Sequence, residues 1–400
     1  MVFAIEKKEL IKLSRDNNYS VNNIEKVLRL CDLLNTINSD THINGKLVLK
    51  GGTAINLVVF EHIPRLSVDL DFDYAYNIEK NDMIKERANI NILLKQKLEE
   101  KGYLLSYRNT FTLDSIHLKY KTLSGSWDKI KLDINYQNRC HIFKPISKII
   151  AMPFLNDGTK VYVNSLQDIE LFAGKIKAFY ERCKPRDLFD IYTIAKSGRI
   201  NDNETKKILR KCIYFYGSIG NIKSKPIFDS DVKRILNIPF QDIKTQLLPM
   251  LHINNGKYPK DEINKTIIDF LSDIMNPDSN NIEFWNKFKD GKYEPEIIFD
   301  NCIAKELKNH PVALYSLQII KENANSIKID RISIYSDFQN INHFVRCYIN
   351  GERQLSVKIA DEDYRLYRNG MVDKESLAQK YFKNEIDCAT SRRENQGVKR

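Results

Sequence analysis

The 400-residue sequence has few cysteines, and their spacing excludes two common stabilising devices. Seven cysteines are scattered through the chain, and no two of them form a Cys-x-x-Cys pair. Because their number is odd and their spacing irregular, the sequence predicts neither a disulfide framework nor a zinc site.

Long apolar segments are also lacking. The first eight residues contain no apolar stretch of the kind that a signal peptide needs. No run approaches the ~18 apolar residues of a membrane-spanning helix. We therefore expect a cytoplasmic protein without a membrane partner.

Charge is abundant and slightly one-sided. The chain has 63 basic and 52 acidic residues, a formal net charge of +11. Such a surplus attracts nucleic acid, but it also arises in lysine-rich genomes, so charge alone does not indicate nucleic-acid binding. Hydrophobic residues make up 42% of the chain, enough for a folded core, and the length favours two or three domains.

A glycine pair follows a short apolar stretch near residue 50. Residues 47–49 predict a strand, and Gly51-Gly52 lets the backbone approach a ligand closely, with N–H groups free for phosphate oxygens. A helix is expected over residues 53–61, ended by Pro64, and its N-terminus would add to an anion site. Arg65 follows this helix and could reach a phosphate.

Residues 67–73 alternate between apolar and acidic side chains. As a strand, this segment places Asp69 and Asp71 on one side, together with Asp73. Two close carboxylates are unfavourable unless a cation lies between them. Mg²⁺, or Mn²⁺ in its place, suits carboxylate and phosphate oxygens.

Each motif has a simpler explanation when taken alone. A glycine pair is usually a turn, and Asp-x-Asp also occurs in glycosyltransferases and phosphatases. A glycosyltransferase is the weaker alternative because its site does not call for the preceding Gly-Gly-Thr helix. The order strand, Gly-Gly, helix and Ser-x-Asp-x-Asp strand favours chemistry on a nucleoside triphosphate.

A third carboxylate lies on a later strand. Residues 129–136 alternate cleanly, with Asp133 on the polar side. A neighbouring strand could bring Asp133 beside Asp69 and Asp71, where it would help to hold metal and activate an acceptor hydroxyl. The alternative is that Asp133 is an exposed aspartate on the solvent-facing side of an edge strand.

Two helices carry further charged candidates. The first is expected to begin with a capping residue near Ser165 and to carry Lys175, which could neutralise triphosphate charge. The second follows Pro185 and carries Asp187 and Asp190 on one face. Alternatively, these charged residues lie on solvent-exposed helix faces and form only weak surface ion pairs. Both interpretations stay open for three basic residues: Arg182, Lys184 and Arg186.

Four segments together resemble the AbiEii/AbiGii abortive-infection toxin family, whose members are nucleotidyltransferases of the polymerase-beta-like superfamily. The segments are KGGTAINL, RLSVDLDF, KLDI and ELFAGKIKAFYERCKPRDLFDIY. They lie in the family's order, and the resemblance as a whole covers roughly residues 20 to 200. Gly52-Thr53 stands where many relatives of the superfamily have Gly-Ser, but threonine keeps the hydroxyl.

The resemblance implies an α+β fold with a mixed sheet, and transfer of NMP from an NTP with Mg²⁺. Its acceptor would be an RNA 3′ end, such as that of tRNA, or a protein hydroxyl, and an antitoxin encoded nearby would be a partner. The expected catalytic residues are Asp69, Asp71, Asp133, Lys175 and Asp190, of which the first three bind metal. The expected nucleotide-binding residues are Lys50, Gly51, Gly52, Thr53, Arg65, Ser67, Arg186 and Asp187. The alternative is an inactive nucleotide- or nucleic-acid-binding regulator on the same fold.

We expect four parts along the chain. Residues 1–200 would form the nucleotidyltransferase domain with N-terminal helices, and residues 201–310 a helical bundle domain. Residues 311–388 would form a small α+β appendix, in which Asn350-Gly351 predicts a β-hairpin. Residues 389–400 are polar and basic and predict a disordered tail.

Overall fold

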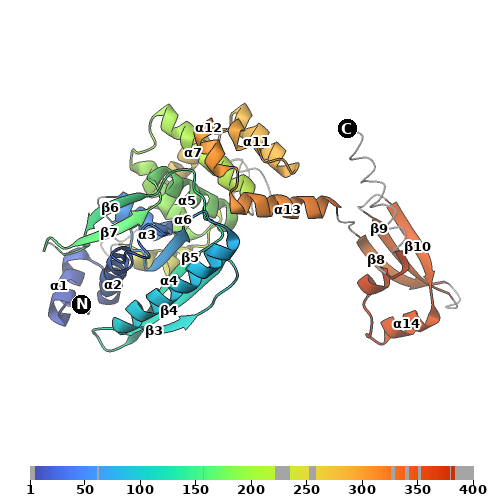
Figure 1. Cartoon of the computed structure of the whole chain (residues 1–400), viewed down its shortest axis with the longest axis horizontal. Coiled ribbons are helices and arrows are strands. Elements are labelled where there is room, and N and C mark those ends of the chain that lie inside the picture. Colours follow the sequence, from blue (N-terminus) through green and yellow to red (C-terminus); the bar gives the residue numbers. More distant parts are fainter. Residues whose placement is uncertain are drawn as a thin grey trace. The chain divides into compact units, whose positions relative to one another are not determined.

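The computed structural model describes residues 5–60, 63–155, 157–220, 235–251, 258–325, 329–337, 342–349, 353–378 and 380–382. The chain divides into two compact units, Met1–Ser316 and Leu317–Arg400 (Figure 1). The boundary expected at 311 lies close to this division, whereas the one expected at 200 falls within the first unit.

The first unit is built on a seven-stranded sheet of order β3-β4-β5-β2-β1-β7-β6 (Figure 1). β2 is parallel to β5 and β1 to β7, while the other neighbours are antiparallel. This mixed sheet confirms the predicted α+β class. The strands are β1 Leu47–Lys50, β2 Asp69–Tyr74, β3 Leu104–Tyr107, β4 Leu113–Lys121, β5 Trp127–Asn135, β6 Ile146–Ala151 and β7 Lys160–Ser165.

One face of the sheet is apolar and carries helices. Alternate residues of β2, β5 and β4, such as Phe72, Leu132 and Ile116, are fully buried there. The helices on this side, α2 (Val21–Asn38) and α4 (Lys80–Glu100), add buried side chains and polar ties to the strands. For example, Tyr74 donates to Glu86 of α4 at 2.7 Å. Alternation therefore sends the acidic side chains of β2 to the opposite face.

Helices from later in the chain belong to the opposite, polar side around β1 and β2. They are α5 (Asp168–Arg182), α6 (Pro185–Lys196) and α7 (Asn203–Ile219). α5 and α6 are the two predicted helices, and Pro185 occupies the first turn of α6. Ser165 is not the cap of α5, because it ends β7 and donates to the Leu49 carbonyl. Gln167 precedes the helix instead.

The helix after the glycine pair differs from the expected one. Its first turn starts at Gly51 rather than Thr53 (α3, Gly51–Thr53), and it continues as a π-helix (η1, Ala54–Val59). It ends at Val59, before Pro64, because Phe60 is already extended. π-helical turns are frequent at functional sites.

A second apolar cluster of the first unit lies between α7 and segments that follow it in the chain. Phe215 of α7 lies 6.1 Å from Phe284 and 5.6 Å from Phe299, measured between ring centroids. The helix expected over 228–238 lies largely outside the described residues. The other helices here are α1 Lys7–Asn17, α9 Phe240–Gln246, η3 Leu248–Met250, α10 Lys260–Ile274, α11 Ser279–Lys289, η4 Pro295–Ile297, α12 Asn301–Leu307 and α13 Pro311–Asn325, which runs into the second unit.

The second unit is a small α+β structure. β8 (Ile329–Ser336), β9 (His343–Ile349) and β10 (Arg353–Ile359) form an antiparallel sheet, followed by α14 (Asp361–Arg368). Val345, Ile359 and Phe382 are buried in its core. The hairpin between β9 and β10 is as expected, but its Asn350-Gly351 turn and the tail over 389–400 lie outside the described residues.

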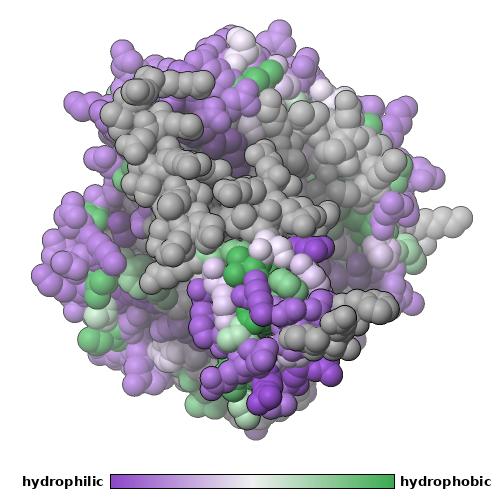
Figure 2. All heavy atoms as spheres, turned by 90° about the vertical axis from the view of Figure 1, so that its right-hand side faces the viewer, coloured by the Kyte–Doolittle hydropathy of each residue, from purple (hydrophilic) through white to green (hydrophobic). Residues whose placement is uncertain are grey.

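The described helices were compared with the length and hydropathy of a membrane span. No described helix is long and apolar enough to cross a bilayer. In Figure 2, described residues on the visible face are mainly hydrophilic, with hydrophobic residues in small groups.

Candidate active site

The three predicted metal-binding aspartates share the polar face of the sheet. Asp71 on β2 is the register partner of Asp133 on parallel β5 and of Lys50 on β1. Asp69 lies two residues before Asp71 and is the register partner of Lys131. The structure thus brings the carboxylates together on one face, as the alternation of both strands predicts.

Asp71 is the electrostatic centre of this row. Burial raises the pKa of its carboxyl, and the neighbouring Asp133 and Asp69 raise it further. The Lys50 and Lys175 ammonium groups act in the opposite direction without cancelling the effect. The surroundings of Asp71 therefore disfavour the charged form of its carboxyl, chiefly through burial.

Asp133 is fixed by two neighbours on the open side of the row. Its carboxylate accepts a hydrogen bond from Ser115 at 2.7 Å and pairs with the Lys131 ammonium at 2.5 Å. Within the described part of the chain, no three His, Cys, Asp or Glu side chains are grouped closely enough to hold a metal ion. Convergence of Asp69, Asp71 and Asp133 on one cation stays a prediction.

The glycine pair fits against the site with no room for a side chain. Gly51 has φ of +72°, and a Cβ there would lie 2.7 Å from Asp71 Oδ2. A Cβ on Gly52 would lie 2.6 Å from Arg65 Nη2. Both glycines are therefore required by close approach to charged side chains of the site.

The nucleotidyl transfer that the family resemblance implies is expected to fall about 10²-fold when Gly51 is replaced by alanine, because the methyl group displaces Asp71. Gly45→Ala is a matched control, since Gly45 also has positive φ (+77°) but open space around it. Both variants should lose a similar ~1–2 kcal/mol of stability from backbone strain. Equal activity of the two in a transfer assay would contradict the role given to Gly51.

Thr53 and Ser67 tie the glycine turn to β2. The fully buried Thr53 hydroxyl donates to the Asp69 carbonyl at 2.5 Å and lies 2.9 Å from Ser67 Oγ. Only 8% of Ser67 is exposed. Both residues therefore stand beside the site as predicted, but the hydroxyls bind the protein rather than pointing freely to a ligand.

Arg65 lies in a buried network rather than in an open pocket. Its Nε and Nη2 donate to the two carboxylate oxygens of Asp190, each at 2.7 Å, and Nη1 donates to the Leu66 carbonyl at 2.9 Å. Arg65 is 2% exposed and Asp190 1%. This bidentate pair fixes the Arg65 guanidinium against Gly52 and so supports the glycine turn.

Lys175 extends the same network through α5 and α6. Its ammonium lies 2.9 Å from carboxylate oxygens of both Asp187 and Asp190. Burial alone would raise the pKa of Asp190, but the Arg65 and Lys175 cations outweigh it and lower this pKa to about 2. Lys175 is thus a buried, paired cation close enough to Asp71 to act on its charge.

Arg182 was not among the expected site residues. Its guanidinium donates twice to the buried Asp187, at 2.7 and 2.9 Å, while its side chain remains 58% exposed. Asp71 contributes to raising its pKa, after the dominant Asp187 hydrogen bond. The spacing of Arg182 and Asp187 across the α5–α6 turn could have indicated the pair. Arg186, which was expected, forms no ion pair within the described ranges.

Lys50 of β1 is held in place by an ion pair with Asp73. Its ammonium lies 2.5 Å from the carboxylate of the fully buried Asp73, which also accepts from Asn138 at 2.8 Å and lies 3.1 Å from His141 Nε2. Burial alone would raise the pKa of Asp73, but Lys50 and His141 bring it below its usual value. Asp73 therefore positions Lys50 and is unsuited to bind metal.

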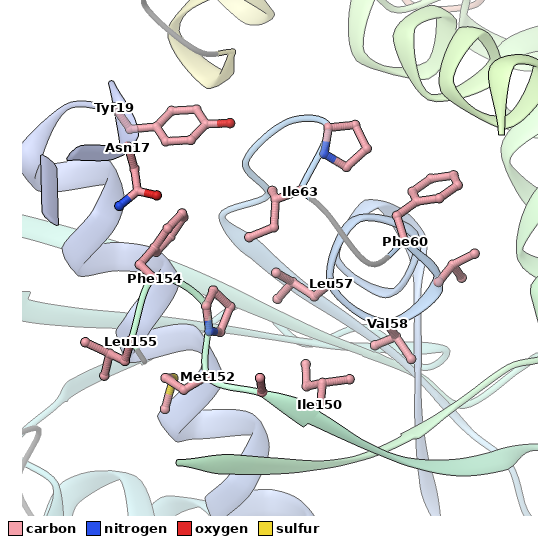
Figure 3. A pocket seen from close by; sticks show the side chains of 14 residues that line it. Asn17, Tyr19, Leu57, Val58, Phe60, Ile63, Ile150, Met152, Phe154 and Leu155 are labelled. Carbon is pink, nitrogen blue, oxygen red and sulfur yellow. The ribbon is translucent and has the colours of Figure 1, made fainter. Parts of the chain in front are cut away.

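A separate apolar groove of about 770 Å³ lies beside η1 and β6. Figure 3 shows Leu57, Phe60, Ile150 and Phe154 among the side chains that line it. None of the expected site residues lines this groove, and the carboxylate row remains the candidate active site.

Comparison with known proteins identifies the family of the chain. The family model described as nucleotidyl transferase AbiEii toxin, type IV toxin–antitoxin system, matches residues 32–265. The chain belongs to this family of nucleotidyltransferase toxins. No curated protein sequence matches the chain.

A solved structure extends the likeness beyond the family segment. It is MenT4, the nucleotidyltransferase toxin Rv2826c from Mycobacterium tuberculosis H37Rv, with a TM-score of 0.52. The match covers 79% of this AbiEii-family chain and 99% of MenT4 at 12% identity. At that identity the likeness concerns the fold alone, and it confirms a nucleotidyltransferase fold.

Proposed function

We propose that this AbiEii-family chain transfers NMP from an NTP to an acceptor hydroxyl, with release of pyrophosphate. The observation that carries the proposal is the row of Asp69, Asp71 and Asp133 beside a glycine turn with no room for side chains. Nucleotidyl transfer needs carboxylates beside a phosphate-binding backbone.

The donor set suits Mg²⁺, or Mn²⁺ in its place. Asp69, Asp71 and Asp133 would hold the cation, since they are hard oxygen donors and since burial, with Asp133 and Asp69, raises the pKa of Asp71. When bound, the cation supplies charge neutralisation for the triphosphate and its leaving group.

Residues of the chain supply the remaining steps. Backbone N–H groups of Gly51 and Gly52 would bind phosphate oxygens, and Lys50 and Arg182 would add positive charge. Asp133, oriented by Ser115 and Lys131, would accept the proton of the acceptor hydroxyl. The buried Arg65–Asp190–Lys175 network would hold the turn in place.

The acceptor is an RNA 3′ end, such as that of tRNA, or a protein hydroxyl. The family's type IV toxin–antitoxin assignment supports an antitoxin as a partner that controls the activity. An inactive nucleotide-binding regulator is the competing function, and the complete set of carboxylates speaks against it.

Incubation with each labelled NTP, Mg²⁺ and total RNA or protein tests the proposal. We expect label to enter one acceptor class with the wild-type chain and incorporation to be lost in the Asp69→Ala/Asp71→Ala variant. Nucleotide binding without incorporation for every NTP and acceptor would instead favour the regulator.

A further inference from the structure

The polar face of the sheet continues past the active-site row onto β5 and β4. Lys131, Lys129 and Trp127 follow Asp133 along this face in steps of two residues. Their register partners on β4 lie on the same face: His117, Lys119 and Lys121. The intervening residues, such as Ile130 and Leu118, are buried on the opposite face.

This face is strongly basic. We call Lys119, Lys121, Lys129 and Lys131 the basic strip. Three of them are exposed, and Lys131 has a side chain that is 43% exposed. Lys131 pairs with Asp133, whereas the other three ammonium groups form no ion pair within the described ranges. The strip therefore presents unneutralised positive charge that begins at the active-site row.

Apart from Asp133, the acidic residue closest to the strip in sequence is turned away from it. Asp128 lies on β5 between Trp127 and Lys129, but its carboxylate pairs with Lys26 of α2 at 2.8 Å on the apolar side of the sheet. Burial lowers the pKa of His117, and Lys129, Arg108 and Lys131 lower it further, while Asp133 acts in the opposite direction.

An aromatic side chain stands at the far end of the strip. Trp127 is 55% exposed, and the Lys119 ammonium lies 4.7 Å from the centroid of its ring. An exposed tryptophan among lysines offers a stacking surface for a base next to contacts for phosphates. Strand geometry places Trp127 about 13 Å from Lys131, a span that suits a few nucleotides.

We propose that the basic strip and Trp127 bind a single-stranded polynucleotide whose end reaches Asp133. The inference rests on the proposed function for the identity of the reaction, but the binding surface stands on its own charges and exposure. Phosphates contact the lysines, a base stacks on Trp127, and the terminal hydroxyl lies at the active-site row. The acceptor class that this surface fits is nucleic acid rather than a protein hydroxyl.

Fluorescence anisotropy of a labelled 12-nucleotide uridine RNA with the full chain, without NTP or Mg²⁺, tests the surface. Lys119→Ala/Lys129→Ala should weaken binding by about tenfold or more at low salt and reduce the salt slope by about 1–2. Trp127→Ala should weaken it by about fivefold or more. The matched control, Lys85→Ala/Lys95→Ala, removes two exposed lysines from α4 and should change binding less than twofold.

The outcomes separate the surface from the reaction. Equal binding by the strip and control variants would overturn the surface, as would competition by poly-glutamate as effective as by unlabelled RNA. If the chain transfers no nucleotide but the strip variants still lose RNA binding, the proposed function fails and the surface stands. Transfer to RNA that is unimpaired in Lys119→Ala/Lys129→Ala would overturn the surface while supporting the enzyme.

Discussion

Replacing Asp71 by asparagine is expected to abolish activity and stabilise the fold at the same time. Nucleotidyl transfer should fall by about 10²–10³-fold or more, because the central carboxylate of the row is lost. The same change removes a charge that burial, Asp133 and Asp69 make unfavourable. We therefore expect a gain of about 0.5–2 kcal/mol in the free energy of unfolding at pH 7.

The pH dependence of this gain follows from the direction of the pKa shift. The folded-state pKa of Asp71 lies above its ordinary value of 3.8, so the ionised carboxylate destabilises the fold above the folded-state pKa. The gain from asparagine should be complete above the folded-state pKa and disappear as pH falls towards 3.8.

Urea unfolding with EDTA present measures the effect without a bound cation. Asp82→Asn is a control that removes a charge from the exposed start of α4, and it should change stability little. A loss of stability in Asp71→Asn at pH 7 would contradict the electrostatic description of the row.

Much of the central site could be predicted because strand alternation fixes which side chains share a face. The segments around Asp69, Asp71 and Asp133 were expected as strands, and their register in the sheet puts Asp71 beside Asp133. The role of the glycine pair was also predictable, since close approach to a neighbouring group is a common reason for glycine next to a strand.

The environments of the charged helix residues could not be predicted. A sequence places Lys175 and Asp190 on helices but does not say which helix face is covered. Lys175 was expected to meet the triphosphate, yet it lies between two buried carboxylates. Arg65 likewise turns inward to its partner Asp190, which lies 125 residues later in the chain and is brought close only by the tertiary fold.

The same limit applies to the sheet and its open face. β6 and β7 were missed because their partners are set by tertiary packing, and β7 joins β1 by a parallel pairing from more than 100 residues away. The lysines around Trp127 did not indicate a binding surface when considered only as part of the amino-acid composition. They indicate such a surface only once the register of β4 on β5 places them on the same face as Asp133.

The buried network makes a second strong prediction, of opposite sign to that for Asp71. Asp190→Asn leaves Arg65 and Lys175 without a shared negative partner in a buried site. Breaking a buried ion pair from one side costs about 3–5 kcal/mol, so we expect a loss of that size at pH 7. Asp168→Asn breaks half-exposed pairs with Lys148 and Arg199 and should cost less than about 1 kcal/mol.

The pH dependence distinguishes this loss from a simple packing defect. The folded-state pKa of Asp190 is about 2, below its ordinary value of 3.8. Its contribution to stability is therefore complete above pH 3.8 and is lost as pH falls towards 2. The difference in stability between wild type and Asp190→Asn, measured by urea unfolding, should begin to narrow below pH 4, and a constant difference down to pH 3 would point to packing. Because Arg65 supports the Gly52 turn, NTP affinity should fall in Asp190→Asn and remain unchanged in Asp168→Asn.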